Sequence, residues 1–242
     1  MQAHPHRDRV SPPPGRHQST GGAAGEALLA IAAPDSNCPS PGTCDHGNPP
    51  ADLGRYEAVL FDWDGTLVDS HPLNFRGLSV ACTHWGLNMD ESFYTARIGT
   101  SGAELINELA IAAGAAVPVD EVVALCLEII LGEIADLRTY PAVVRIAESL
   151  FGRIPLAIAS GGAGRAVHAG LDATSLRPLF ENIVTGEDAP QGKPDPGLFL
   201  LAANRLGVEP SRCLVYEDSP EGMQAAHAAG MRAVNVRCFR SK

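Results

Sequence analysis

The sequence predicts an α/β protein in which a parallel β-sheet lies between two layers of helices and is interrupted by a helical insertion. Short apolar runs alternate with helical segments in the second half of the chain, which is typical of a parallel sheet. Residues 71–150 instead show apolar positions at three- and four-residue spacing, which indicates helices. The chain has 242 residues, 45% of them hydrophobic, enough for the core of one large or two small domains.

The elements are expected in a regular order. The first strand is predicted near residues 57–61, where Ala58 to Phe61 form an apolar run before a glycine-containing turn. The insertion should hold helices at 75–85, 102–113, 120–134 and 142–151. Strands are then expected near 154–159, 182–185, 213–217 and 232–236, with helices near 163–171, 196–206 and 220–229 between them. Gly86 and Gly114 fall where helices should end, and Ser101 with Glu104 predicts a capping box.

Two carboxylates follow the first predicted strand. Asp62 and Asp64 are two residues apart in Asp-Trp-Asp-Gly-Thr, and their charges repel. A cation between them, or different protonation states, would remove the conflict, and phosphoryl transfer uses both solutions. An acidic surface turn is the alternative interpretation, because Asp-Gly is an ordinary turn dipeptide.

Three more polar segments follow later strands or lie on loops, and the first two are Ser160–Gly161 and Lys193–Asp195. Ser160 and Gly161 end the run Leu156 to Ala159, where a hydroxyl and bare backbone N–H groups can hold a phosphate or simply begin a helix. Lys193 precedes a proline and should lie on a loop, either at a site or in solvent. Asp195 can cap a helix that has Pro196 at its first position.

The third polar segment is acidic. Glu217 and Asp218 follow the apolar run that begins at Cys213, and they could alternatively cap the next helix. Ligands of an open parallel sheet bind outside the carboxyl ends of its strands, where all these groups should fall. Together they form a set that can hold a magnesium ion and a phosphoryl group.

The four segments, in this order, resemble the four motifs of the haloacid dehalogenase superfamily. They read Phe-Asp-Trp-Asp-Gly-Thr-Leu-Val-Asp-Ser, Ile-Ala-Ser-Gly-Gly, Gly-Lys-Pro-Asp-Pro and Tyr-Glu-Asp-Ser-Pro-Glu-Gly, and the resemblance covers roughly residues 55–238. It implies a three-layer Rossmann-like parallel sheet core with an inserted helical cap domain. The core would comprise residues 55–70 and 151–242, and the cap residues 71–150. The chain is similar to small sugar-phosphate phosphatases, such as those acting on fructose 1-phosphate or 6-phosphogluconate, and to the beta-phosphoglucomutase-like group.

The resemblance also implies a role for each motif residue. Asp62 would be the nucleophile that forms an aspartyl-phosphate, and Asp64 the general acid and then the general base. Ser160 and Gly161 would bind the phosphoryl oxygens, and Lys193 would neutralise charge. Mg²⁺ would be held by Asp62, Asp64 through its main-chain carbonyl, Asp218 and Glu217.

Substrate selection is expected in the cap. The residues that could face the site there are His71, Asn74, Arg76, Arg97, Thr100 and Ser101. The related mutases have a histidine twelve residues after the nucleophile, where this chain has Asn74. Their cap Lys and Arg positions align with Ile98 and Gly102. Because a second phosphate clamp is missing, hydrolysis is favoured over isomerisation. The alternatives are a sugar-phosphate mutase and a catalytically inactive phospho-ligand binding module.

Composition fits an enzyme acting on a small molecule. The net charge is −10 with no basic blocks, which argues against a nucleic-acid partner. No apolar run reaches the about 18 residues of a membrane helix. The six cysteines form no Cys-x-x-Cys pair, so a reducing cytoplasm is expected. A monomer or weak dimer binding a phosphate ester is expected.

The N-terminal region differs from the rest. Residues 1–54 are rich in Pro, Gly, Ser and His, and they almost lack aromatic residues. This composition predicts a disordered low-complexity tail. Its His and Cys spacing matches no closed zinc site.

Overall fold

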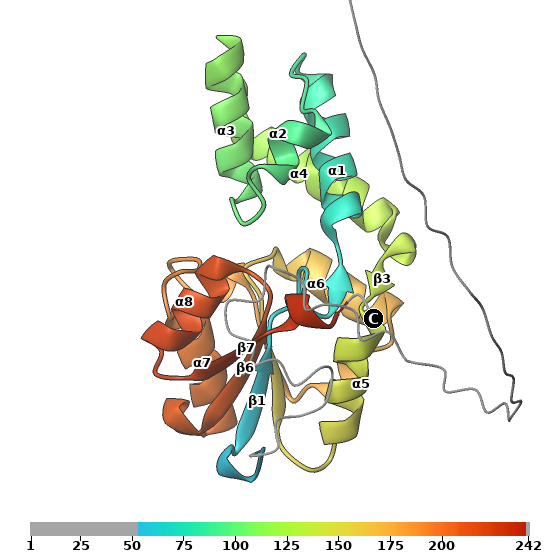
Figure 1. Ribbon diagram of the computed structural model, residues 1–242. Coiled ribbons are helices and arrows are strands. Elements are labelled where there is room, and N and C mark those ends of the chain that lie inside the picture. The colour runs from blue at the N-terminus through green and yellow to red at the C-terminus, as the bar shows by residue number, and fades with distance from the viewer. Residues whose placement is uncertain (1–52, 241–242) are drawn as a thin grey trace, which may run out of the picture. The chain divides into compact units, whose positions relative to one another are not determined.

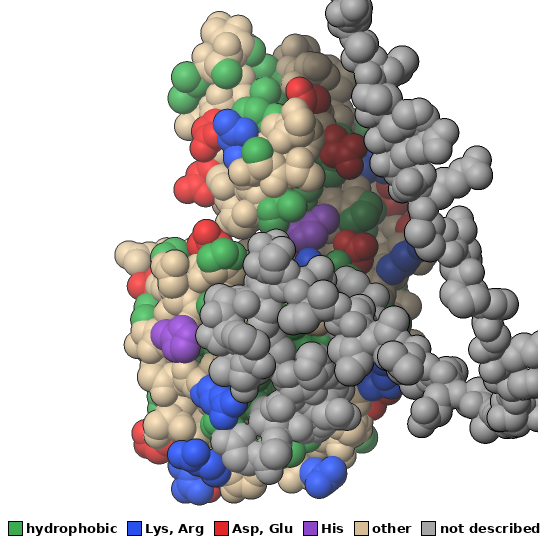
Figure 2. Space-filling view, viewed as in Figure 1, with side chains coloured by type: hydrophobic (Ala, Val, Ile, Leu, Met, Phe, Trp, Pro, Cys, Tyr) green, Lys and Arg blue, Asp and Glu red, His purple; other side chains and the backbone are tan. Residues whose placement is uncertain are grey.

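The computed structural model describes residues 53–240. The expected disordered tail, residues 1–54, lies outside this range except for its last two residues. Within the described range, no helix is both long enough and apolar enough to span a bilayer. Acidic and basic side chains are interspersed over the visible face of the molecule (Figure 2).

A parallel sheet forms the centre of the described chain. Its five strands lie in the order β5-β4-β1-β6-β7, and every neighbouring pair is parallel. The strands are β1 (Ala58–Phe61), β4 (Leu156–Ala159), β5 (Asn182–Val184), β6 (Cys213–Glu217) and β7 (Arg232–Asn235). Every residue of β1, β4 and β6 is buried, because helices cover both faces. The predicted α/β class with a parallel sheet is confirmed.

Helices cover the two faces in separate apolar layers. Alternate residues of a strand point to opposite faces, so Val59 and Phe61 belong to one buried cluster and Ala58 and Leu60 to the other. The first cluster includes α5 (Pro141–Leu150) and α6 (Gly164–Ala173). The second includes α7 (Gly197–Leu206) and α8 (Pro220–Ala228). Figure 1 shows the two pairs on opposite sides of the strands.

A third buried cluster belongs to four helices inserted after β1. They are α1 (His71–His84), α2 (Glu91–Thr95), α3 (Gly102–Ala113) and α4 (Val119–Gly132). Their buried side chains form one cluster, and Figure 1 shows the four helices grouped together. We call residues 71–132 the cap. The chain enters the cap through β2 (Val68–Asp69) and returns through β3 (Arg138–Thr139), and these two short strands pair antiparallel.

The helix expected at 142–151 packs elsewhere than the sequence suggested. Its observed counterpart, α5, buries Val143, Ile146 and Leu150 in the cluster that contains β1 and β4. Apolar periodicity shows that a helix has a buried face but not which partner covers it. We therefore propose that the cap ends near the short 3-10 helix Ile134–Asp136 and that residues from about 138 onward belong to the core.

Local sequence signals predicted both ends of α3, whereas α1 and α7 begin at other residues than predicted. Ser101 and Glu104 form the predicted capping box, and Gly114 ends α3 with a φ of 62°. Asp195 accepts a hydrogen bond from the Gly197 N–H at 2.8 Å. Helix α7 begins at Gly197, one residue later than predicted, with Pro196 at the N-cap position. Helix α1 begins four residues earlier than predicted, at His71, because Pro72 fits the first turn of a helix.

Candidate active site

The predicted core residues meet at the carboxyl ends of β1, β4 and β6. Asp62 and Asp64 follow β1, Ser160 follows β4, and Asp218 follows Glu217 at the end of β6. The carboxylates border a cavity of about 600 Å³ whose opposite wall is made by the cap. Ser160 is fully buried and does not line this cavity. The core side of this cavity contains Asp62, Asp64, Gly161, Lys193, Glu217 and Asp218.

Asp62 is buried, and only one of its two carboxylate oxygens has a hydrogen-bond partner among the described residues. Its Oδ1 accepts a hydrogen bond from Lys193 Nζ at 2.6 Å. Its Oδ2 is buried, and no donor in the described part of the chain reaches it. Burial and the nearby Glu217 carboxylate raise the pKa of Asp62 well above its usual value, although Lys193 opposes this rise. A second cation beside Oδ2 would satisfy that atom and keep Asp62 ionised.

Lys193 is the cationic residue among the described residues that line the core side of the cavity. Its side chain is only 10% exposed, and Nζ also lies 3.4 Å from Glu217 Oε2. Burial alone would lower the pKa of Lys193, but the carboxylates of Asp62 and Glu217 outweigh that effect and raise it. Lys193 therefore stays charged in the neutral pH range and can attract an anionic substrate.

Asp64 lies beside the hydroxyl of Ser160. The Ser160 Oγ is 3.3 Å from Asp64 Oδ2 and accepts a hydrogen bond from the Gly162 N–H at 2.9 Å. The turn after Asp64 needs Gly65, because its φ is +80° and a Cβ there would lie 2.7 Å from Asp218 Oδ2. This turn brings the loop after β1 against the end of β6.

The third acidic group is fixed by its own loop. Glu217 is 1% exposed, and its Oε1 accepts hydrogen bonds from the Ser219 N–H at 3.0 Å and the Ser219 hydroxyl at 2.6 Å. A Cβ on Gly222 would overlap the Glu217 carboxylate, so α8 can approach this close only with glycine there.

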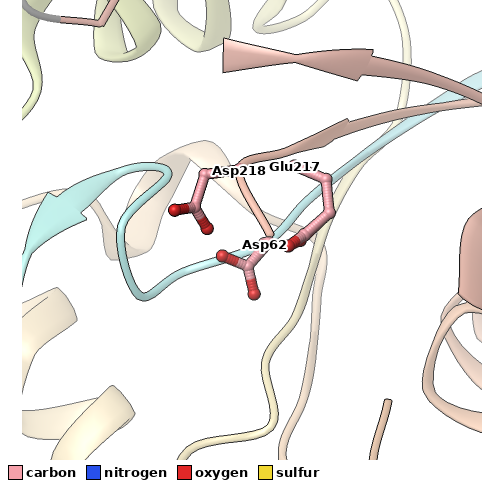
Figure 3. A group of neighbouring side chains, drawn as sticks. All are labelled: Asp62, Glu217 and Asp218. Carbon is pink, nitrogen blue, oxygen red and sulfur yellow. The ribbon is translucent and has the colours of Figure 1, made fainter. Parts of the chain in front are cut away.

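Three carboxylates converge on one point. One oxygen from each of Asp62, Glu217 and Asp218 lies within 4.8 Å of the others, and Figure 3 shows the three side chains turned toward one another. Lys193 and Arg240 offset part of this buried negative charge, and a further cation at the point of convergence would stabilise it. Oxygen ligands and a partnerless Asp62 Oδ2 fit Mg²⁺, which prefers one or two carboxylates and keeps several waters.

The cap side contains five of the six expected candidates. They are His71, Asn74, Arg97, Thr100 and Ser101. Ile98 and Gly102, which align with cationic positions of the mutases, also line the cavity. The expectation for Arg76 is wrong, because Arg76 pairs with Glu133 at 3.0 Å away from this cavity.

Some of these cap groups already have partners. Arg97 Nε donates to Glu108 at 2.7 Å, and its guanidinium lies 3.8 Å from the centre of the Phe93 ring. Ser101 is engaged in its capping box with Glu104. Their hydrogen-bonding groups are therefore partly used within the cap.

Tyr94 is a cavity residue that the sequence did not indicate. Its hydroxyl lies 3.5 Å from His71 Nδ1, and burial raises its pKa. It belongs to α2, whose five residues are too few to show helical periodicity. A signal was present in Asp90, whose side chain caps α2 by accepting from the Phe93 N–H.

The chain matches characterised proteins along most of its length. Residues 56–230 match the family model of haloacid dehalogenase-like hydrolases. The chain is 32% identical over 183 residues to the fructose-1-phosphate phosphatase YqaB of Escherichia coli, covering 76% of this chain and 97% of that protein. It is 30% identical over 182 residues to a phosphorylated carbohydrates phosphatase of Thermotoga maritima, covering 74% of this chain and 83% of that protein.

Solved structures agree with this match. The crystal structure of CbbY from Rhodobacter sphaeroides in complex with phosphate has a TM-score of 0.67 and 26% identity, covering 77% of this chain and 89% of that chain. A putative beta-phosphoglucomutase from Thermotoga maritima has a TM-score of 0.61 and 30% identity, covering 74% and 84%. These proteins share the parallel-sheet architecture described above.

Proposed function

The chain belongs to the haloacid dehalogenase-like hydrolases, and from this premise we propose that it is a magnesium-dependent phosphatase of a small sugar phosphate. The observation that carries the proposal is the environment of Asp62. One carboxylate oxygen is paired with Lys193, while the other is buried and has no donor within the described residues, and the Asp62 carboxylate lies beside those of Glu217 and Asp218. This arrangement suits a nucleophile that needs a cation on each side.

In the first half-reaction, Asp62 attacks the phosphorus atom. A bond forms between a carboxylate oxygen of Asp62 and phosphorus, while the bond from phosphorus to the sugar oxygen breaks. Asp64 donates its proton to that leaving oxygen, and the product is an aspartyl-phosphate on Asp62. Ser160 and Gly161 orient the phosphoryl oxygens, and Lys193 offsets their charge.

In the second half-reaction, Asp64 acts as the base. Its carboxylate takes a proton from water, whose oxygen attacks phosphorus, and the bond to Asp62 breaks to release phosphate. Asp64 lines the same cavity as Asp62, so its carboxylate can reach both the leaving oxygen and the attacking water of an ester bound there.

A metal ion has a clear place in this scheme. Asp62, Asp218, Glu217 and the main-chain carbonyl of Asp64 would hold Mg²⁺. The bound ion would neutralise charge on the phosphoryl group and keep Asp62 ionised. The remaining residues position the ester and transfer the protons.

The cap side of the cavity suits a neutral polyol. Among the described residues that line the cavity, Lys193 and Arg97 are the only Lys or Arg, and Arg97 is engaged by Glu108. The wall also contains the carboxylates of Glu104 and Glu221. These charges disfavour a second phosphate or a carboxylate on the substrate. We therefore favour a ketose or polyol monophosphate of the fructose 1-phosphate type, whose sugar has no charged group besides the phosphate, over 6-phosphogluconate, which also has a carboxylate.

A panel of phosphate monoesters tests this proposal. The purified protein with Mg²⁺ is assayed for phosphate release, with neutral sugar phosphates, 6-phosphogluconate and hexose bisphosphates in parallel. We expect release from neutral sugar monophosphates and loss of activity on exhaustive chelation. Conversion of hexose phosphates without release would indicate a mutase instead, and binding without either reaction would indicate an inactive binding module. Full activity after chelation would contradict the metal requirement.

A further inference from the structure

Arg240 lies at the very end of the described chain yet reaches the centre of the site. The segment after β7 forms a short 3-10 helix (Val236–Cys238), and Arg240 follows it. Its Nη1 lies 2.8 Å from Asp218 Oδ2. The same group donates to the main-chain carbonyl of Gly65. The Arg240 side chain is 16% exposed and that of Asp218 is 4% exposed, so water screens this pair poorly.

The guanidinium also contacts the segment through which the chain returns from the cap. Its Cζ lies 4.8 Å from the centre of the Tyr140 ring. The Tyr140 N–H donates to the carbonyl of Leu67 at 2.8 Å, which ties this residue to the loop after β1. One side chain therefore joins the Gly65 turn, the end of β6 and the start of α5.

This contact gives the two oxygens of the Asp218 carboxylate different environments. Oδ2 is engaged by Arg240, so Oδ1 is the oxygen left for another ligand. Asp218 and Asp62 face each other in Figure 3. A carboxylate without such a partner can rotate and can move away from its like-charged neighbours. An arginine fixes it in one orientation because the guanidinium is planar and offers several donors at fixed angles.

We propose that Arg240 is a positioning residue for the divalent cation site. It holds Asp218 and the Gly65 turn in the arrangement that binds the ion, and it touches neither the ion nor the substrate. The inference rests on the proposed function, since it needs a cation that Asp218 binds. Groups that orient metal ligands in this way typically change metal affinity about 10- to 100-fold when they are removed.

The chain offers a matched control in Arg237. Its Nη2 lies 3.5 Å from the same Asp218 oxygen, but its side chain is 45% exposed. Arg237→Met removes the same charge beside the same carboxylate without removing the short contact. Arg240→Met keeps an apolar stem against Tyr140. Arg240→Lys keeps the charge but has no planar fork to hold Asp218 and the Gly65 carbonyl together.

The test is calorimetric titration of the full-length protein with Mg²⁺, without substrate. We expect Arg240→Met to weaken Mg²⁺ binding about 10-fold or more, Arg240→Lys to restore only part of the loss, and Arg237→Met to change affinity less than about 2-fold. At saturating Mg²⁺, the KM of Arg240→Met for para-nitrophenyl phosphate should stay close to that of the wild-type protein. Thermal melts in EDTA establish that each variant is folded, and Arg240→Lys carries the test if Arg240→Met does not fold.

Three results would overturn the inference. Unchanged or tighter Mg²⁺ binding by Arg240→Met would show that Arg240 is a counter-charge or plays no part. Equal weakening by Arg237→Met and Arg240→Met would assign the effect to charge alone. Failure of the wild-type protein to bind Mg²⁺ would contradict the proposed function itself, and Arg240 would then have no metal ligand to hold.

Discussion

The two walls of the cavity are built differently. On the core wall, Asp62, Glu217 and Asp218 are 5%, 1% and 3% exposed. Each has a cationic partner distant in sequence, Lys193 for the first two and Arg240 for Asp218. On the cap wall, Ser101 is exposed and Thr100 is half-buried. The hydrogen bonds of Ser101 are made within its own helix end.

This contrast separates chemistry from recognition. Buried groups that fix one another keep one geometry whatever the substrate, so changes on the core wall should affect every phosphate ester. Exposed groups on the cap wall can exchange water for substrate hydroxyls, so changes there should alter the ranking of substrates. The predictions below test this division, beginning with the largest expected effect.

Asp62→Asn should abolish turnover on all esters. The substitution keeps the shape of the side chain but removes the attacking charge, so we expect a loss of more than about 10³-fold in kcat. Phosphate release is measured, with circular dichroism to establish the fold. Asp120→Asn, an exposed change in the first turn of α4, is the matched control. Retention of more than about a tenth of the wild-type rate would remove Asp62 from the role of nucleophile.

Asp64→Asn should separate substrates by their leaving group. The variant cannot protonate the departing oxygen, and para-nitrophenolate needs little protonation, whereas a sugar alkoxide needs it fully. We expect formation of the intermediate to slow about 10²-fold or more on a sugar phosphate, and much less on para-nitrophenyl phosphate. Single-turnover bursts measure this step. Equal losses on both substrates would mean that Asp64 acts through position or metal binding alone.

Asn74→Ala should change selectivity and not chemistry. Asn74 faces the cavity from α1, and the loss of one hydrogen bond of about 1 kcal/mol should lower kcat/KM for a sugar phosphate roughly 5- to 10-fold. The rate on para-nitrophenyl phosphate should change less than about 2-fold, since that ester offers no hydroxyl to the cap. Asn107→Ala, on α3 but outside this cavity, is the control. A similar fall on both esters would place Asn74 in the chemical step.

Ser101→Ala should act on stability. Ser101 accepts from the Glu104 N–H as the N-cap of α3, and loss of such a cap costs about 0.5–2 kcal/mol. Urea denaturation should show this loss, while kcat/KM per folded molecule stays nearly constant. Reduced kcat/KM on sugar phosphates with unchanged stability would instead assign Ser101 to substrate binding and remove it from the role of a purely structural cap.

The carboxylates of the core wall could be predicted because they end or follow buried strands. Apolar runs such as Leu156–Ala159 identify a strand by themselves, and parallel topology then brings their carboxyl ends together. The polar residue after each run is therefore assigned to one site without knowledge of side-chain packing. The roles of these residues remain predictions, while their proximity follows from the sheet.

The cap wall lacks such a rule. His71 and Asn74 are three residues apart and share a face of α1, but Arg76 is five residues from His71 and falls on another face, beside Glu133. Which face meets the cavity depends on how α1 packs against α4, which the α1 sequence alone does not specify. Arg240 was missed for a related reason, since a lone arginine after the last strand shows no pattern until folding brings it to Asp218.

Direct detection of phosphate on Asp62 tests the central claim. The wild-type protein is mixed with para-nitrophenyl phosphate and Mg²⁺ under single-turnover conditions, quenched with acid at successive times, and mapped by peptide mass spectrometry. We expect a phosphorylated peptide containing Asp62 that appears with the para-nitrophenolate burst and decays as phosphate is released, and that is absent from Asp62→Asn. Hydrolysis with no phosphorylated peptide at any time, or with phosphate on another residue, would contradict the account.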